Sequence, residues 1–283
     1  MCLGIIGGVS FGTAAIFIRL ITLNAIAITA WRLIIGGSVI SLLMIRKPLA
    51  DENVNYKAIF LLGTILFIHF IFFIKSVQDT FILNATMLVN TAPLLSLIIV
   101  ALLRLEKIDL LDTLAVILSV IGILVMFNCA FRINTETFLG DIEALLAALA
   151  ISIYAVSGRI LLRGKINPIK LSGIVYLLAG VEAIIFSYVV NVNLTPSEVG
   201  EIVFLIALGL IPTAIGHTLF LYSLKGLKPH EIQILALLEP IVATILGVLI
   251  FMEIPPSTSL IGSIIIATTI ILISIRKPLK ETE

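Results

Sequence analysis

The chain has 283 residues, of which 60% are hydrophobic and only 12% are charged, and its mean hydropathy is +1.23. Soluble globular proteins carry roughly a quarter charged residues, so this composition excludes a soluble protein and predicts one that lies in a membrane almost throughout. The 18 basic and 17 acidic residues give a net charge of +1, which provides no basic surface for nucleic acid. Two cysteines, Cys2 and Cys129, are too few for a disulfide framework.

Ten apolar stretches are long enough to cross a bilayer, since a spanning helix needs about 20 mostly apolar residues. In chain order they are 2–19, 26–45, 58–76, 82–103, 112–131, 139–162, 169–191, 202–224, 231–252 and 259–275. The loops between them leave no room for a soluble domain. The first stretch has no basic leader and no small-residue cleavage site, so we expect a retained helix rather than a signal peptide. The predicted fold class is therefore an all-α integral membrane protein with ten transmembrane helices.

Basic residues predict how these helices are oriented, because cytoplasmic loops carry an excess of Lys and Arg. With the N-terminus inside, 14 of the 18 basic residues lie in cytoplasmic segments, and the other four are Arg19, Arg32, Lys75 and Arg132. We therefore expect a multi-pass protein of the cytoplasmic (inner) membrane with both termini in the cytoplasm.

An internal repeat emerges when the chain is shifted by 147 residues. The segment NTAPLLSLIIVALLRLE (90–106) then aligns with LLEPIVATILGVLIFME (237–253), which places Pro93 on Pro240 and Glu106 on Glu253. Ten helices divide into five plus five, with predicted repeats at 1–132 and 138–276, and an odd number of helices inverts the second half. Inverted repeats are common in secondary transporters, whose site lies near the midplane between the halves.

These residues resemble the paired domains of the EamA family, in the drug/metabolite transporter superfamily. The resemblance rests on the proline followed 13 residues later by glutamate in both halves, the arginine of TAWRLIIGG (29–37), and the segments FFIKS (72–76) and FLYSL (220–224). It implies ten helices around a central cavity and the movement of amino acids or other small metabolites, often outward. Arg32 has Ala179 as its approximate counterpart, so the two halves have diverged.

Glu239 and Pro240 interrupt a strongly apolar segment near its middle. A carboxylate at that depth costs roughly 2.5–3.5 kcal/mol, so it should face a cavity or a partner. Pro240 has no N–H and leaves the carbonyl near Ala236 without its helical donor. One interpretation is a packing kink with a neutral Glu239. The other, which we favour, is a cavity site where Glu239 binds a positive group of a solute or a coupling proton.

Arg32 and Glu182 are the other charges deep in predicted helices. A structural ion pair, with each other or with other partners, is the favoured interpretation. Alternatively, Arg32 extends to the membrane surface beside Trp31, or contacts the substrate.

Several polar residues are weaker candidates for substrate binding or coupling. His217 is either a helix contact or a proton carrier, Asn90 either a cavity group or an interhelical hydrogen bond, and Tyr222 could stack on a ligand or simply pack. Glu106 and Glu253 should fix helix ends at the water boundary, and Pro93 should be architectural. Gly8 and Gly12, with Gly4 nearby, give the first helix a small face for close packing.

No catalytic, metal or nucleotide motif is complete. GRILLRGKI (158–166) has the wrong spacing for a phosphate loop, His230-Glu231 lacks a second zinc ligand, and Asp109 and Asp112 are expected to form a solvated helix start. We therefore predict a non-enzymatic secondary transporter without cofactor, coupled to protons or to an exchanged solute, in a monomer or homodimer. A neutral, zwitterionic or cationic solute fits better than a sugar phosphate. A passive channel or scaffold, and less so a membrane enzyme, are the alternatives.

Overall fold

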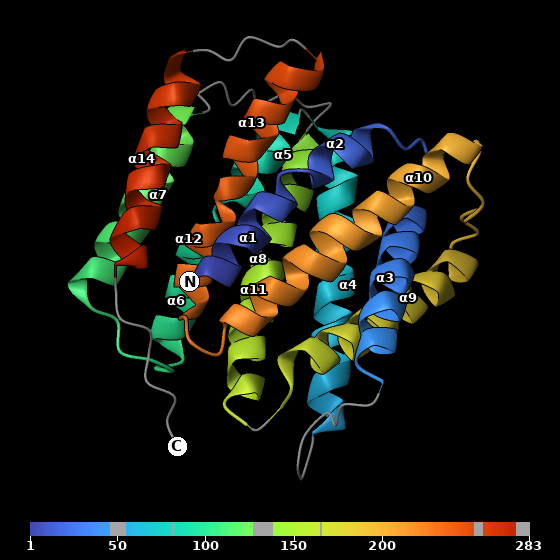
Figure 1. The fold of residues 1–283 in the computed structure, drawn as a ribbon, viewed down its shortest axis with the longest axis horizontal. Helices are drawn as coiled ribbons and strands as arrows, with labels where there is room; N and C mark the ends of the chain where they lie inside the picture. The colour runs from blue at the N-terminus through green and yellow to red at the C-terminus, as the bar shows by residue number, and fades with distance from the viewer. Residues whose placement is uncertain (46–54, 81, 127–137, 165, 252–256, 276–283) are drawn as a thin grey trace.

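The structure is a computed structural model that describes residues 1–45, 55–80, 82–126, 138–164, 166–251 and 257–275. Over these residues it has α-helices, one π-helix and no strand (Figure 1). The elements are α1 (Cys2–Phe11), α2 (Ala14–Arg19), α3 (Ala25–Leu43), α4 (Tyr56–Asp79), α5 (Ile82–Val89), α6 (Ala92–Leu102), α7 (Leu110–Met126), α8 (Phe138–Leu162), α9 (Pro168–Val189), α10 (Val199–Leu208), η1 (Gly209–His217), α11 (Thr218–Ser223), α12 (Pro229–Ala236), α13 (Leu238–Phe251) and α14 (Ser257–Ser274).

Each of the ten predicted spans is largely helical over its described residues, and three of them contain a short break. Six helical segments are long and apolar enough to cross a membrane, and Ala92–Leu102, Leu110–Val125 and Leu260–Leu272 are shorter apolar helices. Asparagines begin three of the helices, because a side-chain oxygen satisfies backbone N–H groups that have no helical partner. Asn24, Asn55 and Asn167 accept such bonds at the starts of α3, α4 and α9.

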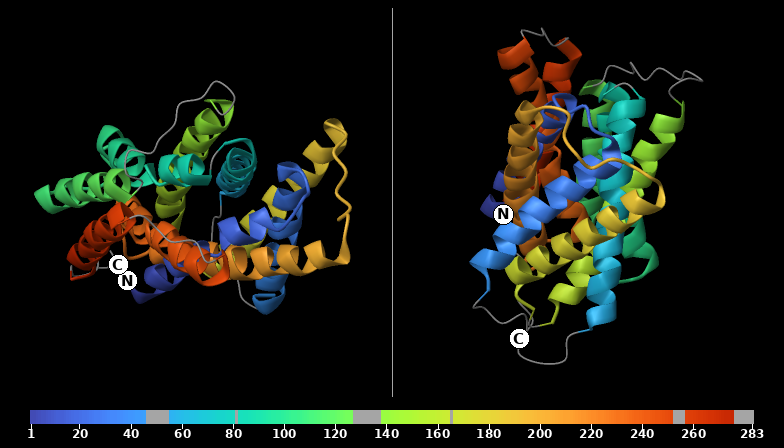
Figure 2. Two further views of the ribbon diagram at one scale, coloured as in Figure 1. Left: turned by 90° about the horizontal axis from the view of Figure 1, so that it is seen from above. Right: turned by 90° about the vertical axis from the view of Figure 1, so that its right-hand side faces the viewer.

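Helices of the two predicted halves pack against each other along the length of the molecule. The most extensive contacts join α3 to α9, α4 to α8 and α7 to α14. Figures 1 and 2 show α7 and α14 on one side of the molecule and α3, α9 and α10 on the opposite side. Glycines permit these close approaches: a Cβ on Gly37 would lie 2.9 Å from the backbone nitrogen of Leu177, and one on Gly180 would lie 2.8 Å from Ile34.

The first helix packs through its predicted glycine face. A Cβ on Gly4, Gly8 or Gly12 would lie 2.6, 2.3 and 2.4 Å, respectively, from atoms of Leu235 or Val242. Gly8 is the closest to backbone, since its nearest neighbour is the carbonyl oxygen of Leu235. The α1–α2 segment is therefore seated against α12 and α13 at the place where these two helices meet.

The expected solvated start of α7 holds for Asp109, which is exposed, but is wrong for Asp112, which is only 2% exposed. Its carboxylate accepts a hydrogen bond of 2.6 Å from the ammonium of Lys228, which also donates to the backbone carbonyl of Lys107 at 2.9 Å. Asp109 and Asp112 additionally accept bonds from each other's backbone N–H, both at 2.9 Å. A charge with a buried partner can leave water, and here the partner comes from the start of α12, far away in the sequence.

Candidate functional site

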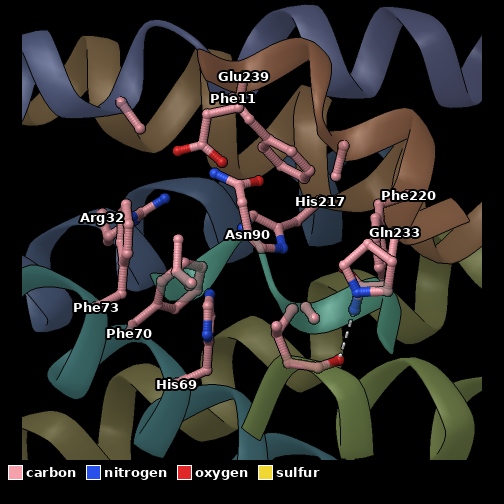
Figure 3. A pocket seen from close by; sticks show the side chains of 16 residues that line it. Phe11, Arg32, His69, Phe70, Phe73, Asn90, His217, Phe220, Gln233 and Glu239 are labelled. Atoms are coloured by element: carbon pink, nitrogen blue, oxygen red, sulfur yellow. Dashed lines mark hydrogen bonds between the residues drawn. The ribbon is translucent and has the colours of Figure 1, made fainter. Parts of the chain in front are cut away.

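Four interrupted helical segments meet at one pocket, which we call the central pocket (Figure 3). Phe11 and Ala14 flank the break between α1 and α2, and Asn90 lies in the break between α5 and α6. His217 ends the π-helix η1. Ala236 and Glu239 flank the break between α12 and α13. Irregular backbone at membrane depth is tolerated where it lines a cavity or is buried in protein, and secondary transporters place their sites at such helix breaks.

The breaks in α5–α6 and α12–α13 agree with the 147-residue repeat. Helix α5 ends at Val89 and α12 ends at Ala236, which is 147 residues further on. Pro93 and Pro240 each follow four residues after these helix ends, so neither can donate the α-helical hydrogen bond to the carbonyl of Val89 or Ala236. Val89 and Ala236 both line the central pocket, whereas Pro240 is buried and does not line it.

The central pocket contains one positive and one negative side chain. The guanidinium of Arg32 and the carboxylate of Glu239 both point into it (Figure 3), and their charges interact electrostatically across it. No direct ion pair between them is found among the contacts of the described residues. The two charges therefore face the same space and remain separate.

Arg32 is held by neutral partners and does not reach the surface, since it is only 1% exposed. Its Nε donates to the hydroxyl of Thr213 at 3.0 Å, and its Cζ lies 3.9 Å from the centre of the Phe70 ring. The predicted pairing of Arg32 with Glu182 is not formed, because Glu182 instead accepts a hydrogen bond of 2.8 Å from Thr64. Nor does Arg32 accompany Trp31, whose indole N–H donates to the carbonyl of Leu194 at 2.7 Å.

Amide side chains of the central pocket are anchored through their nitrogens. Asn90 donates to the carbonyl of Thr86 at 2.8 Å, and Gln233 donates to the carbonyl of Ile151 at 3.1 Å, the bond drawn as a dashed line in Figure 3. Each anchoring bond uses a donor and leaves the amide oxygen as an acceptor. Asn90 and Gln233 can therefore offer hydrogen-bond acceptors to an ammonium or hydroxyl group.

Aromatic rings form the apolar wall of the central pocket. The His217 ring lies 4.6 Å from Phe11 and 4.8 Å from Phe70 between ring centres, and Phe73 and Phe220 also line the space. The buried Nδ1 of His217 has no hydrogen-bond partner among the described residues. His217 thus belongs to an aromatic cluster beside the charged groups, and such a wall suits an apolar part of a ligand.

Two other predicted candidates lie elsewhere. Tyr222 is 38% exposed and does not line the central pocket. Phe220 does line it, and two residues along an α-helix turn a side chain by about 200°, so Tyr222 faces away. Glu106 accepts a hydrogen bond of 2.7 Å from Arg159 near the end of α6, away from the pocket, and its repeat partner Glu253 lies outside the described residues.

Sequence reasoning missed Phe70 and Thr213. Phe70 could have been found from the repeat, since a shift of 147 residues places it on His217, and the two rings do meet. Thr213 has no such signal. Its role depends on η1, a π-helix around Pro212 that no residue pattern in the sequence announces.

Comparison with known proteins agrees with this picture. The chain is 26% identical over 268 residues to an uncharacterized transporter of Archaeoglobus fulgidus, covering 95% of this chain and 93% of that protein. It is 23% identical over 253 residues to the uncharacterized transporter YwfM of Bacillus subtilis, covering 88% and 84% of the two chains. A solved crystal structure superimposes with a TM-score of 0.81 over 96% of this chain and 94% of the other, at 16% identity, which shows a shared fold.

The family match extends over nearly the whole sequence. The sequence model of the EamA-like transporter family matches residues 1–128 and 138–275. The resemblance inferred from the prolines and glutamates is thereby confirmed, and these transporter relatives point to a multi-pass membrane protein engaged in transport rather than to an enzyme. The chain belongs to the EamA-like transporter family.

Proposed function

We propose that this protein is a secondary transporter that moves a small organic solute out of the cell by alternating access. The proposed solute is an amino acid or a similar zwitterion with an apolar side chain. The observation that carries the proposal is that Arg32 and Glu239 line the same pocket but do not form an ion pair with each other. The carboxylate of a zwitterion complements Arg32, its ammonium complements Glu239, and the aromatic wall accommodates the side chain.

The size of the central pocket favours a carrier over a channel. Its volume open to water is about 50 Å³, whereas one water needs roughly 10–15 Å³, so it holds only a few waters. An amino acid with an apolar side chain requires the pocket to widen. In the proposed cycle, the halves move relative to each other and open the pocket to one side of the membrane at a time.

The proposed arrangement has ten membrane-crossing helices in two inverted halves, with both termini in the cytoplasm. Its support is the 147-residue repeat, the equivalent helix breaks at Val89 and Ala236, and the bias of basic residues. Glu239 would exchange its solute for a proton during the return step, since a carboxylate at a helix break can bind either one. The protein acts in the cytoplasmic membrane as a monomer or homodimer.

Counterflow in proteoliposomes tests this function. Vesicles loaded with one unlabelled amino acid at high concentration should transiently accumulate the same labelled amino acid above its external concentration. Only a carrier that exchanges solutes gives this overshoot, and a channel merely equilibrates the label. The panel should compare leucine, phenylalanine and lysine with a sugar phosphate. Equilibration without overshoot for every active solute refutes alternating access, and preference for the sugar phosphate refutes the zwitterion site.

A further inference from the structure

Thr213 occupies an unusual position in the bundle, inside the π-helix η1 and directly after Pro212. It is fully buried. Its hydroxyl donates to the carbonyl of Leu208 at 2.9 Å, five residues earlier. Pro212 lacks the N–H that would bond this carbonyl in a regular α-helix, and the π-helix instead brings Thr213 to it, five residues on, where the hydroxyl also donates. With its hydrogen committed in this way, the oxygen can only accept.

The group that donates to Thr213 is the Nε of Arg32, at 3.0 Å. Close packing brings the two helices together at this point, since a Cβ on Gly36 would lie 2.9 Å from the carbonyl oxygen of Gly209. The face of the guanidinium is covered by Phe70 at 3.9 Å. One edge and one face of the Arg32 guanidinium are therefore fixed by protein groups that carry no charge.

The terminal nitrogen Nη1 of Arg32 is left for another partner. Nη1 is buried and has no hydrogen-bond partner among the described residues. A buried donor without a partner destabilises the protein, and more so when the group is charged. The group that best satisfies a guanidinium is a carboxylate or phosphate, which accepts two parallel hydrogen bonds. Glu239 carries a carboxylate in the same pocket, but among the described residues it forms no ion pair with Arg32.

We infer that Thr213 is a positioning residue that determines selectivity for solutes with a carboxylate. By accepting from Nε, it orients the guanidinium so that the terminal nitrogens face the central pocket and bind the carboxylate of the solute. The inference rests on the proposed function and names a residue that acts through Arg32. Without the hydroxyl, the guanidinium can turn about the last torsion angles of the Arg32 side chain. The geometry that gives two parallel hydrogen bonds to a carboxylate is then lost.

Binding to purified protein, measured by isothermal titration calorimetry in detergent, tests this inference. The probes are the twenty common amino acids, followed by the decarboxylated amine of the tightest binder. Three variants are compared with the wild type. Thr213→Val keeps the shape and removes the hydroxyl, Thr213→Ser keeps the hydroxyl, and Thr29→Val is the matched control. Thr29 is buried one turn before Arg32, and among the described residues its hydroxyl bonds only the carbonyl of Ala25 in its own helix, at 2.8 Å.

Thr213→Val is expected to bind the amino acid roughly tenfold more weakly, the effect of losing one hydrogen bond to a charged group. It should bind the amine as the wild type does. Thr213→Ser should restore amino-acid affinity, and Thr29→Val should leave both affinities unchanged. Equal affinities of Thr213→Val and the wild type for the amino acid overturn the inference while the proposed function stands. Equal weakening for amino acid and amine also overturns it, because the role of Thr213 is then structural. Failure of the wild type to bind any amino acid overturns the proposed solute class and this inference together.

Discussion

Replacing Gly8 with alanine should separate the first helix from the break between α12 and α13, one of the breaks at the central pocket. A Cβ at this position would lie 2.3 Å from the carbonyl oxygen of Leu235 and 3.1 Å from its carbonyl carbon. Ordinary contact begins at 3.4 Å, so α1 has to move by about 1 Å. The obstacle is backbone on α12, which cannot turn aside as a flexible side chain could. Inserting a methyl group into such a packed contact costs about 1–3 kcal/mol.

Two other glycines make this a graded test. A Cβ on Gly7 would lie 3.1 Å from the carbonyl oxygen of Gly216, a milder contact, and one on Gly200 would meet nothing within 4 Å. Melting temperatures in detergent should therefore fall for Gly8→Ala by roughly 5 °C, fall less for Gly7→Ala, and stay level for Gly200→Ala. Solute counterflow should decline in the same order, since α1 rests on the break between α12 and α13. A Gly8→Ala protein as stable and active as Gly200→Ala would refute the close packing of α1 against α12.

Three further substitutions test the pocket and the buried charges. Glu239→Gln keeps the size of the side chain and removes its charge. The variant should insert into the membrane normally, yet lose transport or the dependence of transport on pH. Wild-type transport rates from about pH 5.5 to 8 would contradict a coupling role. Pro240→Ala supplies the missing N–H and should lower the turnover rate more than the melting temperature, whereas an equal loss of both would indicate a packing role. Asp112→Asn leaves Lys228 buried without its carboxylate and should lower the unfolding free energy by about 3–5 kcal/mol. Adding Lys228→Met should recover part of this loss. No loss of stability in the single variant would contradict the buried pair.

The sequence was sufficient to predict the helical class, the approximate helix positions and the family. These follow from local properties: runs of apolar residues, and prolines and glutamates at fixed spacing. Proline also marked the break before α13, because a missing N–H is a property of one residue and needs no tertiary information. The break between α1 and α2 was not predicted, since Gly12 and Thr13 do not by themselves interrupt a helix.

The composition of the central pocket could be predicted only in part. Glu239, Asn90 and His217 were identified as polar groups at membrane depth, and all three line the pocket. Arg32 was assigned a structural role with Glu182 because both are charged and lie at similar depth in their helices. Depth does not determine which face of a helix points inward. The face of α3 that points inward depends on how this helix is rotated about its own axis against α9 and η1. That rotation is set by close contacts of glycines on all three helices.

The central pocket draws its two charged groups from different predicted halves, Arg32 from the first and Glu239 from the second. Burying either charge costs roughly 2.5–3.5 kcal/mol, and a direct ion pair would offset part of that cost. Such a pair would also leave neither charge for a solute. Arg32 is instead held by Thr213 and Phe70, with its buried Nη1 unpaired among the described residues, and Glu239 lies at a helix break without an ion pair to Arg32. Under the proposed function, a zwitterion of matching length would pair with both groups at once. In the proposed cycle, movement of the halves would change the separation of these two side chains and with it their affinity for the solute, which would link binding to alternating access.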